Sequence, residues 1–392
     1  MFYLLSGLLL PSEVIGSSND PDVSAIHLGM STVLSGPASD LGINMLAGIR
    51  AAFEEANRAG GIRGRRLQLT ALDDGYEPMR TAPNMRRLVD ELGVLAVIGN
   101  VGTPTAVAAL PIISDSKTPF VAPFSGAGIL RRTPPDHFVV NFRASYAEET
   151  GAMVDALIRE AGLKPQEIAF FTQRDAYGDA GFSGGVAALK RHGMTNEMSV
   201  PHVRYERNTA AVERALADLL LLNIPPRAVI MVGAYAPCAA FIKQARENGL
   251  DALFLNVSFV GPTSLLKALG SQGEGVLVTE VVPHFDSPLP GVRAFHAAMK
   301  SADPGYTPSF GSLEGYLAGR MFCLALQRYP GPLTRESIIA ALEQMGEFDL
   351  GIGAQLKLTA TEHQASHTVW PMIFRHGHVV PFDWKEWSAR GR

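Results

Sequence analysis

Two short polar segments follow apolar runs of the chain and carry side chains suited to binding a small anion. These segments are residues 101–105 (Val-Gly-Thr-Pro-Thr) and residues 123–127 (Pro-Phe-Ser-Gly-Ala). Their hydroxyl groups and unhindered backbone amides are natural donors to a carboxylate. The candidate contacts are Thr103, Thr105, Phe124, Ser125 and Gly126. The same hydroxyls could instead cap helices, and one geometry can serve both purposes.

Two tyrosines occupy comparable places later in the chain. Tyr177 follows the apolar segment 168–172, and Tyr235 follows the segment 228–233. Each would supply a flat apolar wall and a hydroxyl donor to a bound molecule. The alternative role for each is packing beneath a loop. We interpret both as candidate ligand contacts.

The chain opens with a strand, a loop of small residues and a helix. The predicted strand is residues 25–34, and Ser35 begins the loop. Apolar residues then recur at helical spacing until Gly60-Gly61, where a left-handed conformation would end the helix. Such a loop points free N–H groups and the helix dipole at a small anion. Ser35 is therefore a further candidate contact.

Strand-like and helix-like segments alternate along the rest of the chain. The predicted strands are 66–72, 95–100, 119–122, 168–172, 198–203, 228–233 and 253–257. The predicted helices are 81–92, 105–114, 148–161, 182–192, 210–222 and 237–248. This alternation predicts an α/β protein whose parallel sheets carry helices on both faces. A length of 392 residues favours two lobes. In open parallel sheets ligands bind beyond the carboxyl ends of the strands, which is where the candidate residues lie.

Several motifs together resemble one known family. They are Ser35-Gly36-Pro37, Gly60-Gly61-Ile62-Arg63-Gly64, Val97-Ile98-Gly99, Tyr177-Gly178 and Gly233-Ala234-Tyr235. In order and spacing they resemble the periplasmic binding proteins of the leucine/isoleucine/valine-binding family, over residues 24–385. The resemblance implies a type 1 periplasmic binding fold, with two doubly wound lobes joined by three hinge crossings. It implies lobe I at 24–143 plus 281–352 and lobe II at 144–280 plus 353–392, after a possible leader at 1–23.

The resemblance also implies a function. A member of this family would be an extracytoplasmic solute-binding protein that captures a small carboxylate-bearing ligand, such as an amino acid or a related organic acid. It would deliver that ligand to the membrane permease of an ABC-type importer. We expect no catalysis, no cofactor and no metal. A ligand-sensing regulatory protein or receptor domain of the same fold is the alternative.

The family resemblance assigns roles to particular residues. Thr103 and Ser125 align with loops that bind the ligand carboxylate. Tyr177 and Tyr235 align with aromatic positions that contact the ligand from the second lobe.

Where branched-chain binders place an acid for the ligand ammonium, this chain has Ser258. Because a buried ammonium without a carboxylate partner is costly, either another acid such as Asp175 or Glu280 substitutes, or the ligand has no amine. Leu41 stands where a tyrosine often lies, which makes that wall more apolar.

Amino-acid composition favours some classes of protein and argues against others. With 47% hydrophobic residues, 18% charged residues and a net charge of −4, the chain is typical of a packed protein and has no basic patch for nucleic acid.

The two cysteines, Cys238 and Cys323, are expected to be separate buried thiols. The first-lobe disulfide of related binders is absent, because Tyr76 and Gly102 match its positions. Residues 2–10 resemble the core of a secretory signal without its basic start, which favours a periplasmic location.

Three other patterns suggest chemistry that we do not expect. Residues 181–185 (Gly-Phe-Ser-Gly-Gly) fit the hydrolase pattern G-x-S-x-G but do not join a strand directly to a helix. Residues 126–128 (Gly-Ala-Gly) lack the third glycine of a dinucleotide site. Four histidines between 363 and 378 would need further ligands nearby to bind a metal.

Overall fold

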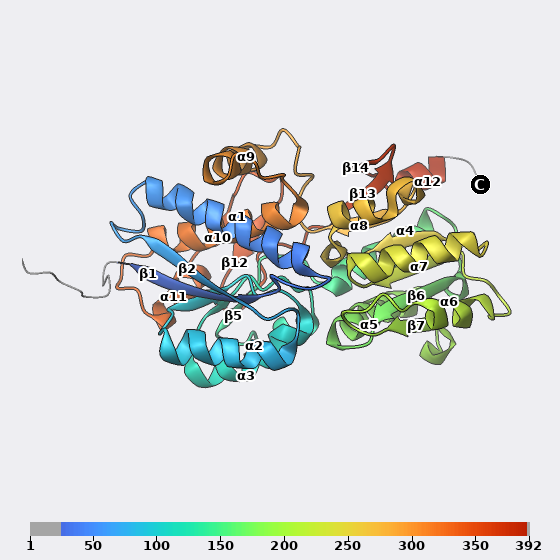
Figure 1. Cartoon of the computed structure of the whole chain (residues 1–392), viewed down its shortest axis with the longest axis horizontal. Helices are drawn as coiled ribbons and strands as arrows, with labels where there is room; N and C mark the ends of the chain where they lie inside the picture. Colours follow the sequence, from blue (N-terminus) through green and yellow to red (C-terminus); the bar gives the residue numbers. More distant parts are fainter. Residues whose placement is uncertain (1–24, 390–392) are drawn as a thin grey trace, which may run out of the picture.

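The computed structural model describes residues 25–389 and shows two α/β lobes side by side (Figure 1). Lobe I contains a five-stranded sheet of parallel strands in the order β2-β1-β3-β4-β5. Its strands are β1 (Ile26–Thr32), β2 (Leu67–Asp73), β3 (Ala96–Ile98), β4 (Phe120–Val121) and β5 (Val139–Val140). Its helices are α1 (Ser39–Arg58), α2 (Pro78–Arg86, continued by a π-helical turn Arg87–Glu91), α3 (Thr103–Ser116), α9 (Pro290–Ala302), α10 (Phe310–Arg328) and α11 (Arg335–Glu343).

Lobe II contains a seven-stranded sheet in the order β14-β13-β10-β9-β8-β6-β7, in which only β13 and β14 run antiparallel to their neighbours. Its strands are β6 (Ile168–Gln173), β7 (His202–Tyr205), β8 (Ala228–Val232), β9 (Leu253–Asn256), β10 (Leu277–Glu280), β13 (Trp370–Arg375) and β14 (His378–Pro381). Its helices are α4 (Tyr146–Arg159), α5 (Ala176–Arg191), α6 (Glu213–Leu220), α7 (Tyr235–Glu247), α8 (Pro262–Leu269) and α12 (Lys385–Ala389).

The two lobes share one strand order. The order β2-β1-β3-β4-β5 of lobe I is repeated as β7-β6-β8-β9-β10 in lobe II. The predicted α/β architecture with parallel sheets is confirmed. Helices cover both faces of the first sheet: Ile98 and Val121 belong to the main core with α1, whereas Val97 and Phe120 belong to a second cluster with α2 and α3. A strand order of this kind creates a switch point, where ligands bind beyond the strand ends.

Glycines allow the closest helix contact in lobe I, between α1 and α10. A Cβ atom on Gly48 would lie 2.0 Å from the carbonyl oxygen of Ser312, and one on Gly315 would lie 2.3 Å from that of Met45. The two backbones therefore touch directly. This packing holds α10 against α1 and places the start of both helices beside the cleft described below.

The chain passes between the lobes three times. It leaves lobe I after β5, returns after β10, and enters lobe II for the last time before β13. Before that last crossing, β12 (Leu356–Leu358) pairs with β11 (Gly346–Phe348), and Gln364 bridges to Asn141 at the edge of lobe I. We therefore propose that the third crossing lies between Ser366 and β13, later than the boundary at 352 expected from the sequence.

Several elements begin or end elsewhere than predicted. Helix α5 begins at Ala176 instead of 182, because the Asp175 carboxylate accepts a hydrogen bond from the backbone N–H of Tyr177 and caps it. Residues 181–185 consequently lie inside α5, where a Cβ on Gly185 would touch the ring of Phe170 at 2.4 Å. These glycines allow close packing, and the segment is not a nucleophile turn. Within residues 25–389, the structure contains no helix of the length and apolarity needed to cross a bilayer.

Candidate functional site

The carboxyl ends of the two sheets meet across a cleft between the lobes. Gln173, the last residue of β6, donates a hydrogen bond of 3.1 Å to the hydroxyl of Tyr76, which follows β2. Ser264 of α8 donates one of 2.8 Å to Asp40 of α1. Tyr235, half-buried at the start of α7, also reaches Ser39 and Asp40. The lobes therefore contact one another on both sides of the strand ends, in a closed arrangement.

Thr103 and Ser125 lie together at the lobe I side of this cleft. Their hydroxyl oxygens are 2.7 Å apart, and both side chains are fully buried. Thr103 is the first residue of α3, so the free N–H groups of that helix lie beside it. Two buried hydroxyls at a helix N-terminus can donate to a carboxylate.

Thr105 and Gly126 have local roles in the structure. The Thr105 hydroxyl donates to the backbone oxygen of Gly102 at 2.9 Å, within the first turn of α3. Gly126 leaves room for Tyr146, since a Cβ there would lie 2.6 Å from the Tyr146 backbone nitrogen. The carbonyl of Gly126 also accepts a hydrogen bond of 2.7 Å from that nitrogen.

Ser35 lies apart from this cluster. It is exposed, and its hydroxyl donates to Asp73 at 2.6 Å. Asp73 also accepts hydrogen bonds from the N–H groups of Leu34 and Gly75, and these bonds hold its pKa at about 2 against the effect of burial. The Ser35 hydroxyl therefore organises the loop after β1.

Aromatic rings fill the middle of the cleft. The ring of Phe259, from the turn after β9, lies 5.4 Å from that of Phe124 and 4.7 Å from that of Tyr177. Tyr177 in turn packs at 5.1 Å against Tyr146 and donates to the carbonyl of Gly233 at 3.3 Å. The cluster joins Phe124 of lobe I to aromatic residues of lobe II and forms a continuous apolar wall.

Tyr76 and Gly102, the positions matching the family's disulfide, are in direct contact. A Cβ on Gly102 would lie 2.2 Å from the Tyr76 ring, and the backbone φ of Gly102 is +103°. Only glycine fits both demands. A direct aromatic–glycine contact therefore joins these two positions, and both cysteines in the described part of the chain are free and buried.

Arg143 is buried where the chain first passes from lobe I to lobe II, next to the ring of Phe124. Its guanidinium carbon lies 4.8 Å from the centre of the Phe124 ring, and Nη2 donates to the hydroxyl of Ser258. Nε and Nη1 have no hydrogen-bond partner among residues 25–389. Burial alone would lower the pKa of Arg143, but Glu314, Tyr146 and Glu149 outweigh it and raise the pKa above its ordinary value. The residue is therefore a permanent cation with two guanidinium nitrogens available to donate.

Ser258 links Arg143 to a buried carboxylate. Glu149 of α4 accepts hydrogen bonds from the Ser258 N–H at 2.7 Å, the Ser258 hydroxyl at 3.0 Å and the Thr279 hydroxyl at 2.7 Å. Its Oε1 is also 3.5 Å from Arg143 Nη2. Burial raises the pKa of Glu149 despite the nearby Arg143. Glu149 is thus a saturated acceptor that holds the turn at Ser258 in place.

Two more carboxyl groups lie beside Arg143. Glu314 of α10 has Oε1 at 3.7 Å from Arg143 Nε, and burial raises its pKa to about 7. Glu280 lies at the end of β10, and its Oε1 is buried without a hydrogen-bond partner among residues 25–389. Burial, together with Glu149, raises the pKa of Glu280 well above the ordinary value. Glu280 and Glu314 line one cavity of ≈ 20 Å³ with Phe124 and Ser258. This volume holds about one water-sized group.

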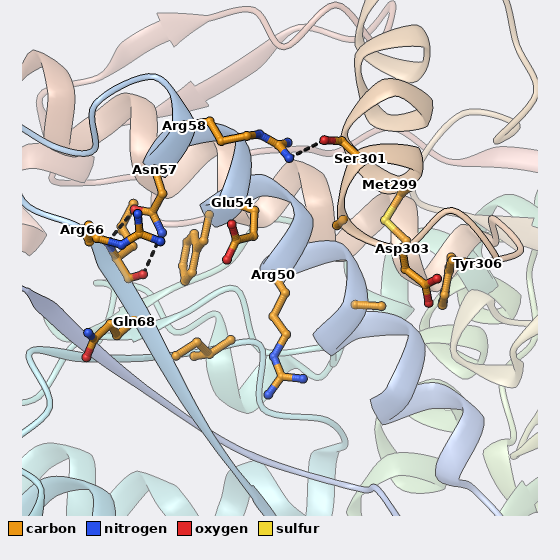
Figure 2. A pocket seen from close by; sticks show the side chains of 15 residues that line it. Arg50, Glu54, Asn57, Arg58, Arg66, Gln68, Met299, Ser301, Asp303 and Tyr306 are labelled. Carbon is orange, nitrogen blue, oxygen red and sulfur yellow. Dashed lines mark hydrogen bonds between the residues drawn. The ribbon is translucent and has the colours of Figure 1, made fainter.

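A larger hollow of ≈ 700 Å³ lies away from the cleft, between α1, β2 and α9 (Figure 2). Figure 2 shows Arg50, Glu54 and Arg58 extending from one side of α1 and Arg58 hydrogen-bonded to Ser301. Charges of both signs line this hollow, and it is half open. The cleft is the better candidate site because its polar groups are buried, convergent and partly without partners.

The candidates Thr103, Ser125, Tyr177 and Ser258, which the sequence alone suggests, all lie around the cleft. Arg143, Glu149 and Glu314 also lie there and are not among the sequence candidates. A signal was present, since Arg143 ends an apolar run and Glu314 interrupts the apolar face of a helix. Charges at such positions are rarely buried unless they are paired. No group of three or more His, Cys, Asp or Glu side chains in the described part of the chain is placed to hold a metal.

Residues 25–377 match the family model described as "Periplasmic binding protein". The chain belongs to this family. The leucine-specific-binding protein of Salmonella typhimurium is 27% identical over 299 residues, covering 76% of this chain and 77% of that protein. The crystal structure of a possible leucine/isoleucine/valine-binding protein from Rhodopirellula baltica SH 1 has a TM-score of 0.91 and 53% identity, and the match covers 94% of this chain and 99% of that one.

A solved structure of lower sequence identity shows the same fold. The solute-binding protein of an ABC transporter from R. palustris, solved in complex with benzoate, has a TM-score of 0.78 and 21% identity, with 91% of this chain and 95% of that one covered. The type 1 periplasmic binding fold implied by the sequence motifs is thereby confirmed. Both of these named proteins bind solutes: the Salmonella protein is named for leucine, and the R. palustris protein was solved with benzoate.

Proposed function

We propose that this chain is an extracytoplasmic solute-binding protein that captures a small carboxylate-bearing ligand, an amino acid or a related organic acid, between its lobes. It then delivers the ligand to the permease of an ABC-type importer in the bacterial envelope. The observation that carries this proposal is the buried Arg143, whose Nε and Nη1 lack hydrogen-bond partners within residues 25–389. Its guanidinium packs against Phe124, the residue that precedes Ser125 of the Thr103–Ser125 hydroxyl pair. A buried polar group normally has a partner, so a bound carboxylate is the missing one.

The arrangement also supports a closing mechanism. Thr103 and Ser125 belong to lobe I, and Tyr177 and Ser258 belong to lobe II, while Arg143 lies at the crossing between them. A ligand shifts a conformational equilibrium only by the contacts it gains in one state. A carboxylate held first by the hydroxyl pair would gain the contacts of lobe II only on closure.

The carboxylate site can be tested by removing one hydroxyl. Native mass spectrometry of the purified protein, followed by denaturation, would identify the retained molecule, and calorimetry would then measure its affinity for Thr103→Val. We expect a loss of about 10- to 100-fold, since a hydrogen bond to a charged group contributes about 1.5–3 kcal/mol. Thr118→Val removes an equally buried hydroxyl, 2.8 Å from Ser116 and outside the cleft, and should leave affinity unchanged. A retained ligand without a carboxylate, or equal affinities, would contradict the proposal.

A further inference from the structure

Another hollow, of ≈ 550 Å³, lies on lobe I away from the cleft, between α3 and the segment 129–139. None of its described lining residues lines the cavity between the lobes. Figure 1 shows α3 beside α2, on the face of the sheet opposite α1. The hollow is therefore separate from the proposed ligand site. Its volume is in the range of pockets that hold one small molecule, about 300–1,000 Å³.

Apolar side chains form most of the wall of this hollow. Ile113 and Val139 are buried in the second core cluster of lobe I, and Phe138 packs against that cluster. Val107 of α3 and Ile129 after β4 also line the hollow but stay 36% and 37% exposed. Exposed apolar side chains that gather in a concave place are typical of a binding surface.

The hollow has a cationic end and an apolar end. Lys117, at the C-cap of α3, lies just before β4, and His137 lies just before β5. Because β4 and β5 are parallel and Phe120 pairs with Val139, both residues lie at the amino ends of neighbouring strands. Val107 lies near the opposite end of α3, and the helix extends about 15 Å from there to Lys117. The hollow is thus elongated along α3.

The Lys117 ammonium is the charge of this lining that has no counter-ion. Arg132 lies 3.5 Å from Asp136, and His137 lies 2.7 Å from Glu336 of α11. The exposed Lys117 ammonium makes neither an ion pair nor a hydrogen bond within residues 25–389. Lys117 and Arg132 therefore face one acid among the described lining residues, which leaves an excess of one positive charge. The carbonyl end of α3 accounts for a cation here, but not for the apolar wall beside it.

We propose that this hollow is a second binding site and that it takes one small amphipathic anion, a medium-chain carboxylate. Its hydrocarbon tail would lie between Val107 and Ile129, with its carboxylate beside Lys117. Covering the apolar wall favours the tail, and the ammonium donates to the carboxylate. A compact ion such as phosphate would leave the apolar wall exposed to water. The site does not depend on the proposed function, because it takes no residue from the cleft.

A series of carboxylates tests this site on the full chain. Calorimetry would measure binding of butanoate, hexanoate and octanoate, with octanamide as the neutral partner of octanoate. We expect affinity to rise about fourfold for each added methylene, because each one is buried in the hollow. Octanamide should bind about fivefold more weakly than octanoate, since it lacks the charge. Absence of octanoate binding at millimolar concentration, or equal affinity for all three acids, would overturn the proposal.

Two variants locate the bound acid. Lys117→Gln should weaken octanoate about fivefold and leave octanamide unchanged. Val107→Asp places a carboxylate against the tail and should weaken both probes about tenfold or more. Leu220→Asp, on a similarly exposed side chain at the end of α6 in lobe II, should change neither affinity. Unchanged octanoate affinity in both hollow variants, with thermal unfolding showing that they fold, would contradict the site.

A cleft variant separates this site from the proposed ligand site. Thr103→Val removes a hydroxyl of the cleft and should bind octanoate as the parent does. Loss of octanoate binding in Thr103→Val, with normal binding in Lys117→Gln, would place octanoate in the cleft. That result would overturn the second site and leave the proposed function intact. In the other direction, Val107→Asp should keep the parent's affinity for the molecule retained in the cleft.

Discussion

Arg143 determines the charge balance of the cleft at the scale of single residues. It is the cation closest to Glu149 and Glu314, and it also lowers the pKa of Glu280 in opposition to burial. Breaking a buried ion pair by removing one partner is costly, because the remaining charge is left uncompensated. The stability of the molecule should therefore depend on this side chain more than on any exposed ion pair.

Replacing Arg143 tests this dependence. We expect Arg143→Met to lower the free energy of unfolding by about 3 kcal/mol at pH 8, measured by urea denaturation. The loss should be smaller at pH 5. Carboxyl groups with a raised pKa in the folded state destabilise it as pH rises above their unfolded-state value, and protonation at low pH removes that penalty.

Arg143→Lys is the control, since it keeps the charge in nearly the same volume. It should lose less stability than Arg143→Met and show a weaker dependence on pH. Equal losses for Arg143→Met at pH 5 and pH 8 would indicate that the neighbouring carboxyl groups are already neutral in the folded protein.

At the scale of elements, the contact between α1 and α10 positions the lobe I side of the site. Glu314 reaches the cleft because Gly315, its neighbour, lets α10 approach the backbone of α1. Met45 and Ile49 of α1 lie directly against this glycine. A larger residue would push the helix outward and carry Glu314 with it.

Gly315→Ala tests this contact. Its Cβ would lie 2.3 Å from the Met45 carbonyl oxygen, and a backbone atom cannot move away as a flexible side chain can. We expect a loss of about 3 kcal/mol in thermal or urea unfolding. Gly305→Ala, whose nearest neighbour would be Asp303 at 3.6 Å, should stay within about 0.5 kcal/mol of the parent. Similar stabilities for the two variants would show that α10 shifts without cost.

At the scale of the whole molecule, polar contacts at one edge of the cleft hold the lobes together. Arg207 of lobe II lies 2.8 Å from Glu77 of lobe I, and Asn208 donates to Glu77 at 2.6 Å. Arg207 also pairs with Asp175 of its own lobe at 3.1 Å. The two contacts with Glu77 join the lobes, so we expect them to favour the closed state.

Arg207→Ala should shift the ligand-free protein toward open forms. Small-angle scattering would report this as a larger radius of gyration, and ligand affinity should fall about fivefold, because a partly exposed ion pair contributes about 1 kcal/mol. Arg174→Ala is the matched control, since Arg174 pairs with Glu206 of the same lobe at 2.6 Å. A change in radius of similar size for both variants would argue against a role of Arg207 in closure.

Local sequence determined the elements and the placement of several site residues. Alternating apolar and amphipathic segments defined the two parallel sheets. Residues at strand ends, such as Thr103, Ser125 and Tyr177, could be placed near one another because the strand ends of parallel sheets share one edge. Element boundaries were less accurate. The start of α5 depended on a cap at Asp175, and strand β7 begins at His202 because residues 197–199 form a 3-10 turn.

Only the tertiary structure decided the charge distribution of the cleft. Arg143, Glu149, Glu280 and Glu314 are widely separated in sequence, and their polar character alone predicts exposed positions. Their proximity depends on the packing of β9, β10 and α4 in lobe II and on the approach of α10 to α1 in lobe I, which are long-range contacts without a local signal. The sequence therefore determined the two α/β lobes and the strand ends at which we propose that a ligand binds, whereas the charge distribution of the cleft became apparent only in the tertiary structure, where Arg143 lies beside carboxyl groups from both lobes.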